Sequence, residues 1–273
     1  MAKENTAPVT GKKRRWKRNL MTTFIIALVL YIGAHVLSRT EGIRAAVTDK
    51  LSSGTRQQIS LEKCSMTPLC GLRLQRLRFQ GVEMPDVKMS FNWIFFLFKE
   101  RPFVRELRIQ GLEIRFRQIP ISGNWEPLVL NSVGNRLGEV LGLKPSPEGK
   151  DESLPKFPAF VINEKTLLQL NRAKVVWRDA KEREVAYITD VDLKLKSGSF
   201  IKRKAIQTIV KCGHVKLASG QAIRDFRLEA FRIEGSSVVT VLDMADSNGE
   251  YPEFASDTLW KDLNLYLIQL LEE

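Results

Sequence analysis

The sequence has few of the side chains that enzymes most often use for catalysis. Among its 273 residues there are two histidines, His35 and His214, and three cysteines, and there is no CxxC, HExxH, GxGxxG or P-loop motif. Histidine-assisted nucleophiles and His/Cys metal sites need such groups close together. The sequence therefore predicts a protein that is not an enzyme and has no cofactor and no metal site.

Positive charge is concentrated at the N-terminus. The first eighteen residues contain seven basic residues and one acid, Glu4, which gives +6 of the total +12. The basic residues expected to set the orientation in a membrane are Lys12, Lys13, Arg14, Arg15, Lys17 and Arg18. An apolar stretch follows directly, so these basic residues are explained by their role in orienting the chain across a membrane. They need no nucleic-acid partner.

The apolar stretch LMTTFIIALVLYIGAHVL (Leu20–Leu37) contains no Lys, Arg, Asp or Glu. As a helix it would be about 27 Å long, close to the hydrocarbon thickness of a bilayer. The pattern predicts a cytoplasmic head at 1–19, a transmembrane anchor at 20–38 and an exported remainder; a cleaved signal peptide is the alternative. The anchor residues expected to contact lipid are Leu20, Phe24, Ile25, Leu28, Leu30 and Leu37.

The exported part alternates between apolar and polar residues over most of its length, which is typical of strands with one buried face. We expect a first β module with short helices at 39–143, a flexible linker at 144–158, a second antiparallel β module at 159–256 and a C-terminal helix at 257–273. The predicted fold class is mainly β: an elongated, curved antiparallel sheet with an apolar inner face, following the transmembrane helix.

One phrase recurs within this pattern, as LRFQGVEM (Leu77–Met84) and LRIQGLEI (Leu107–Ile114), with a shorter copy, FRIEG, from Phe231. Apolar side chains lie at odd positions before each glycine and at even positions after it. A strand changes parity in this way only at a bulge or corner, so Gly81 and Gly111 are predicted strand corners. The candidate apolar groove then comprises Leu77, Phe79, Val87, Met89, Phe91, Leu107, Ile109, Ile114 and Phe116.

Two of the cysteines, Cys64 and Cys70, flank a short segment that contains Pro68. In an oxidising compartment such a pair could form a disulfide around a small loop. Buried free thiols at these positions are the alternative.

The order of these features resembles the amino-terminal part of the AsmA-like family of bacterial envelope proteins, over about Thr40 to Ser197. The resemblance rests on the anchor, the short helix before GLRLQRLRFQGVEM, the segment VRELRIQGLEIRFRQ and the later hairpin NRAKVVWRDAKEREVAYITDVDLKLKS. It implies a single-pass protein of the bacterial inner membrane, with a cytoplasmic N-terminus and a groove-like sheet in the periplasm. It also implies a non-catalytic role in phospholipid handling or transport, or in outer-membrane biogenesis. The implied partners are membrane lipids, other envelope proteins or further copies joined through sheet edges.

A different function stays open at this stage. The predicted helices at 128–143 and 257–271 could cover the apolar face and leave no groove. The chain would then be a bitopic structural or scaffold subunit of an envelope or secretion complex. About ten strands spaced ~4.8 Å apart would also extend only ~50 Å, which is too short to cross a periplasm alone. The chain could therefore be one module of an assembly, a regulator, or a relic of the family with a scaffold role.

Overall fold

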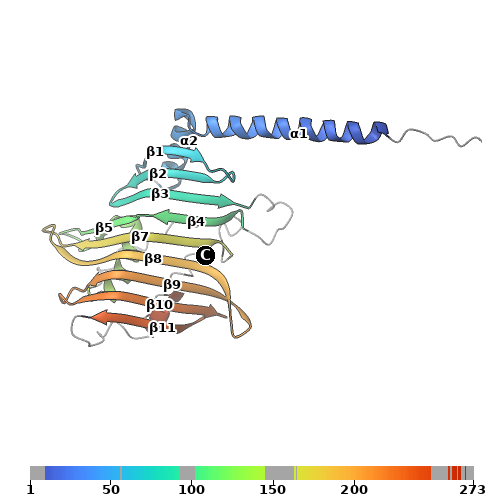
Figure 1. The fold of residues 1–273 in the computed structure, drawn as a ribbon. Helices are drawn as coiled ribbons and strands as arrows, with labels where there is room; N and C mark the ends of the chain where they lie inside the picture. Colours follow the sequence, from blue (N-terminus) through green and yellow to red (C-terminus); the bar gives the residue numbers. More distant parts are fainter. Residues whose placement is uncertain are drawn as a thin grey trace, which may run out of the picture.

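The computed structural model describes residues 10–55, 57–92, 102–144, 163 and 165–246, with 258, 260–262, 264, 265 and 268 near the C-terminus. Most of these residues form one sheet of eleven strands (Figure 1). The strands are β1 (Ser60–Met66), β2 (Leu72–Phe79), β3 (Val82–Phe91), β4 (Val104–Gln110), β5 (Glu113–Gln118), β6 (Trp125–Glu126), β7 (Leu167–Arg178), β8 (Glu184–Phe200), β9 (Arg203–Lys216), β10 (Ala222–Ile233) and β11 (Ser236–Asp246). The prediction of a mainly β chain is confirmed.

The sheet is mixed, so the prediction of a purely antiparallel sheet is wrong. Its main path is β1-β2-β3-β4-β7-β8-β9-β10-β11, and both β4 and β5 pair with β7 in parallel. The strand β6 pairs with β5 alone, and the chain joins the main path again at β7, which runs in the same direction as β4 and β5. The segments predicted as two β modules are therefore parts of one sheet. Of the predicted linker at 144–158, all but Lys144 lies outside the described residues.

The helices lie at the ends and on one side of this sheet. They are α1 (Thr10–Leu37), α2 (Glu41–Thr55), a 3₁₀ turn η1 (Leu128–Leu130) and α3 (Asn131–Val140). A C-terminal helical segment is described at 258, 260–262, 264, 265 and 268. Its buried side chains are Trp260, Asn264 and Ile268, spaced one turn apart on one face. The other residues of the predicted helix at 257–273 lie outside the described part of the chain.

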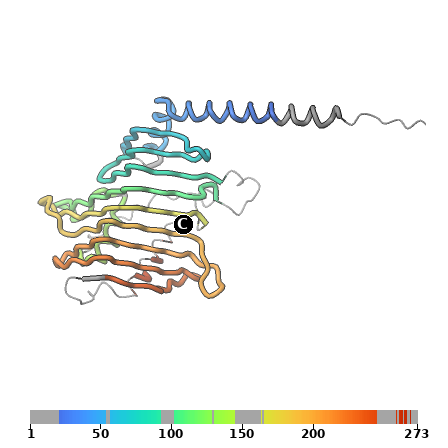
Figure 2. The backbone as a smooth tube through the Cα atoms, viewed as in Figure 1, coloured from blue at the N-terminus to red at the C-terminus, as the bar shows by residue number. Residues whose placement is uncertain are grey.

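The helix α1 extends away from the sheet beside β1 (Figures 1 and 2). Its apolar side chains from Met21 onward are largely exposed, with Phe24 at 66% and Leu30 at 67%. Among the described residues, no single helix is long and apolar enough to cross a membrane; Met21–Leu37 and Glu41–Ser53, bent by 68°, meet those limits only as a pair. The side chains of Leu20 and of the basic residues before it lie outside the described part.

A line of left-handed backbone conformations crosses the sheet, and we call it the crease. Its members have φ between +50° and +72° and come from β2, the β4–β5 junction, β7, β8 and β10: Arg76, Gly111, Arg172, Asp190 and Asp225. Strand pairing aligns these members across the sheet, with β3 and β9 between some of them. For example, the Gly111 N–H donates at 2.8 Å to the carbonyl of Asn171, which precedes Arg172. The apolar face is thereby kept on one side while the sheet bends.

The effect of the crease on side-chain direction is visible in the middle strands. In β7 the inward residues change from even to odd between Leu170 and Ala173, across Arg172. In β9 the same change occurs between Cys212 and Val215, next to Asp190 of β8. Each strand therefore presents apolar side chains to the same interior on both sides of the bend.

The two predicted corner glycines have different roles. Gly111 (φ +72°) lies in the crease, between β4 and β5, which follow one another along β7. Gly81 (φ +69°) instead lies in the two-residue hairpin that joins Phe79 to Val82, and the corner of β2 is at Arg76. The third copy of the phrase is also a hairpin, with Gly235 at φ +83°.

Candidate functional site

Two rows of side chains run across the strands on the inner face of the sheet. Each contains one residue from each strand of the nine-strand main path, paired with its neighbours. The first row is Cys64, Leu74, Val87, Ile109, Leu170, Leu193, Val210, Leu228 and Leu242. The second row is Met66, Leu72, Met89, Leu107, Leu168, Leu195, Thr208, Ala230 and Val239. At ~4.8 Å per strand the rows are roughly 38 Å long, and Thr208 is their only member with a side-chain oxygen or nitrogen.

The two ends of the rows are covered by helices. At the β1 end, Val47 and Leu51 of α2 pack on the cluster that contains Cys64, Leu74 and Val87. At the β9–β10 end, Trp260 and Ile268 of the C-terminal segment pack against the sheet. Between these covers the row members are only half-buried: Met89, Leu107, Ile109, Leu168, Leu170 and Leu193. Met66, Leu72, Val210, Val239 and Leu242 are half-buried as well, so partial exposure extends along both rows and includes the middle of the apolar face.

The predicted groove residues differ in how deeply they are buried. Phe79, Met89, Phe91, Leu107 and Ile109 are half-buried, and the Phe91 ring stacks on Phe103 with 4.9 Å between centroids. Two others, Leu77 and Val87, are buried in the cluster under α2. Ile114 lines the cavity described below.

The prediction that Phe116 lines the groove is wrong. Its side chain is 0% exposed and belongs to the core under α3. Its ring stacks on Trp177 with 5.3 Å between centroids. The Trp177 Nε1–H donates to the Gly134 carbonyl at 3.2 Å. A Cβ at Gly134 would lie 2.7 Å from Phe116 Cε1, so the glycine lets α3 approach the ring closely.

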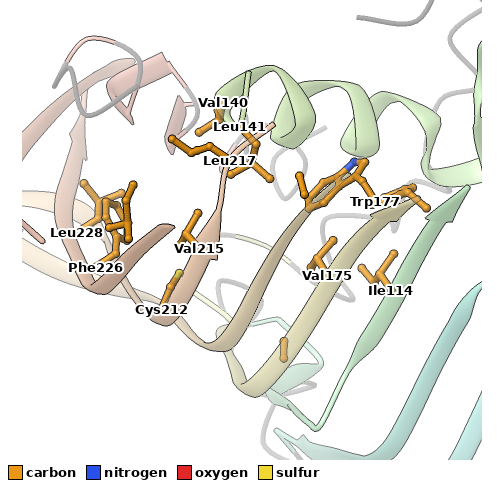
Figure 3. Close-up of a cluster of buried hydrophobic side chains, with 14 of the residues drawn as sticks. Ile114, Val140, Leu141, Val175, Trp177, Cys212, Val215, Leu217, Phe226 and Leu228 are labelled. Atoms are coloured by element: carbon orange, nitrogen blue, oxygen red, sulfur yellow. The ribbon is translucent and has the colours of Figure 1, made fainter. Parts of the chain in front are cut away.

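An apolar cavity of about 200 Å³ lies between the sheet, α3 and the C-terminal segment. Figure 3 shows Ile114, Val175 and Val215 on the strands below α3, at whose end lie Val140 and Leu141. The cavity is somewhat larger than the ~150 Å³ cavity that holds benzene, and it meets the first row at Leu170, Leu193, Val210 and Leu228. It is therefore a partly enclosed extension of the apolar face, with room for the end of a hydrocarbon chain.

Two polar side chains line this cavity, Thr208 and Asn264. Neither the Thr208 hydroxyl nor Asn264 Oδ1 has a hydrogen-bond partner within the described part of the chain. The amide nitrogen of Asn264 donates to Ser237 Oγ at 2.9 Å, which fixes the direction of its carbonyl oxygen. Unpaired polar atoms of this kind destabilise a buried, dry site.

Replacing Thr208 with Val should therefore raise the free energy of unfolding by about 1 kcal/mol, since the shape is kept and the unpaired hydroxyl is removed. Chemical denaturation monitored by tryptophan fluorescence measures the change. The matched control is Thr240→Val, which removes a hydroxyl that donates to the Glu229 carbonyl at 3.1 Å and should be neutral or slightly destabilising. A clear loss of stability in Thr208→Val would mean that an internal water or a ligand satisfies this hydroxyl.

The outer face of the sheet is charged, and several of its cations are paired with acids. Four arginines of this face each lie within 3 Å of a carboxylate: Arg76 with Glu62, Arg78 with Glu83, Arg108 with Glu106 and Arg115 with Glu113. Burial alone would raise the pKa of Asp86, but hydrogen bonds from Arg73 and Lys88 outweigh it and lower that pKa. This face is a solvated surface of ion pairs.

The three cysteines are free thiols, so the suggested Cys64–Cys70 disulfide is absent. Cys64 is buried in the first row, whereas Cys70 lies in the β1–β2 turn with φ +55°. Cys212 lines the cavity, where burial raises the pKa of its thiol to about 12. Within the described residues, no group of three or more His, Cys, Asp or Glu side chains is placed to hold a metal ion.

Comparison with protein-family models and with curated proteins finds no match to this chain.

Proposed function

We propose that this chain is a membrane-anchored, non-catalytic protein that holds lipid acyl chains on the apolar face of its sheet. The observation that carries the proposal is the pair of rows that cross nine strands with a half-buried middle. Each methylene kept from water is worth about 0.8 kcal/mol, so a chain lying along either row is stabilised without any reaction. The cavity beneath α3 offers a place for the chain end.

The anchor in this proposal is the apolar stretch Leu20–Leu37, within α1. Its exposed apolar side chains and the basic residues before it favour insertion into the bacterial inner membrane, with the N-terminus in the cytoplasm. Since α2 follows α1 directly and packs beside β1, both rows would begin at the membrane surface and lead into the periplasm. The resemblance to AsmA-like envelope proteins supports the same arrangement and a role in phospholipid handling or outer-membrane biogenesis.

One observation favours a second function, that of a scaffold subunit in an envelope complex. The helix α2, the helix α3 and the C-terminal segment each cover part of the apolar face. If this cover were complete in the cell, the face would be an ordinary core and lipid would not reach it. The two functions differ in whether lipid contacts the middle of the rows.

Site-specific photo-crosslinking in intact bacteria tests this difference. A photoreactive amino acid is placed at Leu107 or Leu168 on the inner face, and at the adjacent Arg108 or Gln169 on the outer face. We expect lipid-mass adducts at the two inner positions and not at the two outer ones. The anchor is identical in all four variants, so lipid bound to α1 does not affect the comparison. Absence of inner-face adducts, or equal adducts on both faces, would contradict the proposal.

A further inference from the structure

The turn between β1 and β2, residues 67–71, lies against the C-terminal end of α1. The Tyr31 hydroxyl donates to the Pro68 carbonyl at 2.8 Å, and the Met66 N–H donates to Ser38 Oγ at 3.0 Å. His35 Nε2 lies 3.1 Å from the Tyr31 hydroxyl. These three side chains of α1 are half-buried and follow one another on a single face of the helix. The turn is therefore held along that face.

These contacts set how far the turn reaches along α1. Tyr31 lies six residues before Leu37, the last residue of the apolar stretch, which corresponds to ~9 Å of helix. The apolar stretch is about as long as the hydrocarbon layer of a bilayer is thick. With α1 in the membrane as proposed above, the Pro68 carbonyl would lie below the edge of that layer. Figure 1 shows β1 beside this end of the helix.

The side chains of the turn suit such a position. None of residues 66–72, with the sequence MTPLCGL, is charged. The Leu69 side chain is 81% exposed. The β7–β8 turn, in contrast, contains Asp179, Lys181 and Arg183, and charged groups of this kind are strongly disfavoured in hydrocarbon. The β1–β2 turn can therefore leave water without burying a charge.

Much of the backbone of the turn is also hydrogen-bonded. The Thr67 N–H donates to the Gly71 carbonyl at 2.8 Å, and the Cys70 N–H donates to the Thr67 carbonyl at 2.9 Å. The Gly71 N–H donates to Thr67 Oγ1 at 2.9 Å. Pro68 has no N–H, and its carbonyl accepts from Tyr31. Backbone polar groups need such partners in hydrocarbon, where no water can replace them.

We propose that the β1–β2 turn is inserted in the membrane beside α1, with the Leu69 side chain among the acyl chains close to the headgroups. The proposal rests on the membrane anchor of the proposed function and adds a second point of contact with the bilayer. Met66 and Leu72, on either side of the turn, are the first two members of the second row. That row then begins within the membrane, which is the source of its lipid.

Fluorescence quenching at two depths tests the proposal. The full chain, with a fluorescent amino acid at one position, is reconstituted in vesicles of phosphatidylethanolamine and phosphatidylglycerol. The vesicles also contain a lipid that has a nitroxide either near its headgroup or at the end of an acyl chain. The probe is placed at Leu69, at Leu28 in the middle of the apolar stretch, or at Ala180. Ala180 is the matched control, because it is an uncharged residue of the β7–β8 turn, at the opposite end of the strands.

We expect the probe at Leu69 to be quenched chiefly by the nitroxide near the headgroup, and the probe at Leu28 chiefly by the nitroxide at the chain end. Both effects should be lost at Ala180. Quenching at Leu28 alone would overturn this inference and leave the anchor of the proposed function intact. Quenching at none of the three positions would overturn the anchor itself. Equal quenching at Leu69 and Ale180 would mean that the whole sheet lies on the bilayer, and would overturn the assignment to this turn.

The variant Tyr31→Phe tests what holds the turn at this depth. It keeps the aromatic ring and removes the hydroxyl that donates to Pro68. Quenching at Leu69 should fall, because the turn is no longer tied to α1 at that point, while quenching at Leu28 should not change. The control is Tyr187→Phe, which removes a hydroxyl from β8 and should change neither signal. Unchanged quenching at Leu69 in Tyr31→Phe would overturn the role given to this hydrogen bond.

Discussion

Replacing Phe116 with Ala should lower the free energy of unfolding by about 3–5 kcal/mol, the range for a large aromatic residue deleted from a tight core. The ring is fully buried between Trp177 of β7 and Gly134 of α3. The helix is held there by the hydrogen bond from Trp177 and cannot move in to fill the space without breaking it. The loss therefore includes a cavity term as well as the transfer of the ring.

Urea denaturation followed by tryptophan fluorescence measures this loss. Phe116→Leu, which retains much of the volume, should recover more than half of the stability and keeps the test informative if the alanine variant does not fold. The control is Phe200→Ala at the end of β8, where a half-buried ring contacts Phe231 with 4.9 Å between centroids and should contribute about 1 kcal/mol. Equal losses in Phe116→Ala and Phe200→Ala would show that α3 does not pack as described.

The strands could be predicted from the sequence because each has one buried face and so alternates with a period of two. The order of pairing could not be predicted to the same extent. Hairpins such as β2–β3 follow from local turns, but the parallel contact of β4 with β7 joins segments on either side of a long connection. That contact depends on the path of the intervening chain, which alternation does not specify. Alternation alone therefore predicted two antiparallel modules.

Only some positions of the crease could be predicted from the alternation of apolar residues. Gly111 could be predicted because a glycine stands where parity changes, and its φ of +72° suits that residue. Arg172 and Asp190 adopt similar angles without the help of a glycine, so residue type gave no signal there. The change of parity across each of them was nevertheless present in the sequence. Gly81 was misplaced because a two-residue hairpin, which pairs Phe79 with Val82, also changes parity.

The candidate site depends on helices whose position the sequence does not specify. Phe116 and Ile114 follow the alternation expected of groove residues. Phe116 is in the core because Gly134, on the separate helix α3, packs closely against its ring. The unpaired Thr208 hydroxyl likewise depends on how distant segments pack around it. Alternation could identify an apolar face, but it could not show which part of that face is covered.

The half-buried middle of the face gives the largest expected effect on lipid binding, through Leu168→Asp. Leu168 is half-buried in the second row, between Leu107 of β4 and Leu195 of β8. A carboxylate there would need to lose its water when an acyl chain lies over it, which is strongly unfavourable. We expect the lipid bound by the purified full chain to fall at least about tenfold, since 1.4 kcal/mol is enough for that factor.

The matched control is Gln169→Asp, which introduces the same charge one residue further along β7, on the outer face beside Arg108. Circular dichroism and the unfolding midpoint establish that both variants keep the fold, which a half-buried position should allow. Lipid retained in Gln169→Asp but lost in Leu168→Asp would place the acyl chain on the rows, because both variants have the same anchor and net charge. Equal lipid in both would mean that the bound lipid belongs to α1, and the scaffold function would then be the better account of the sheet.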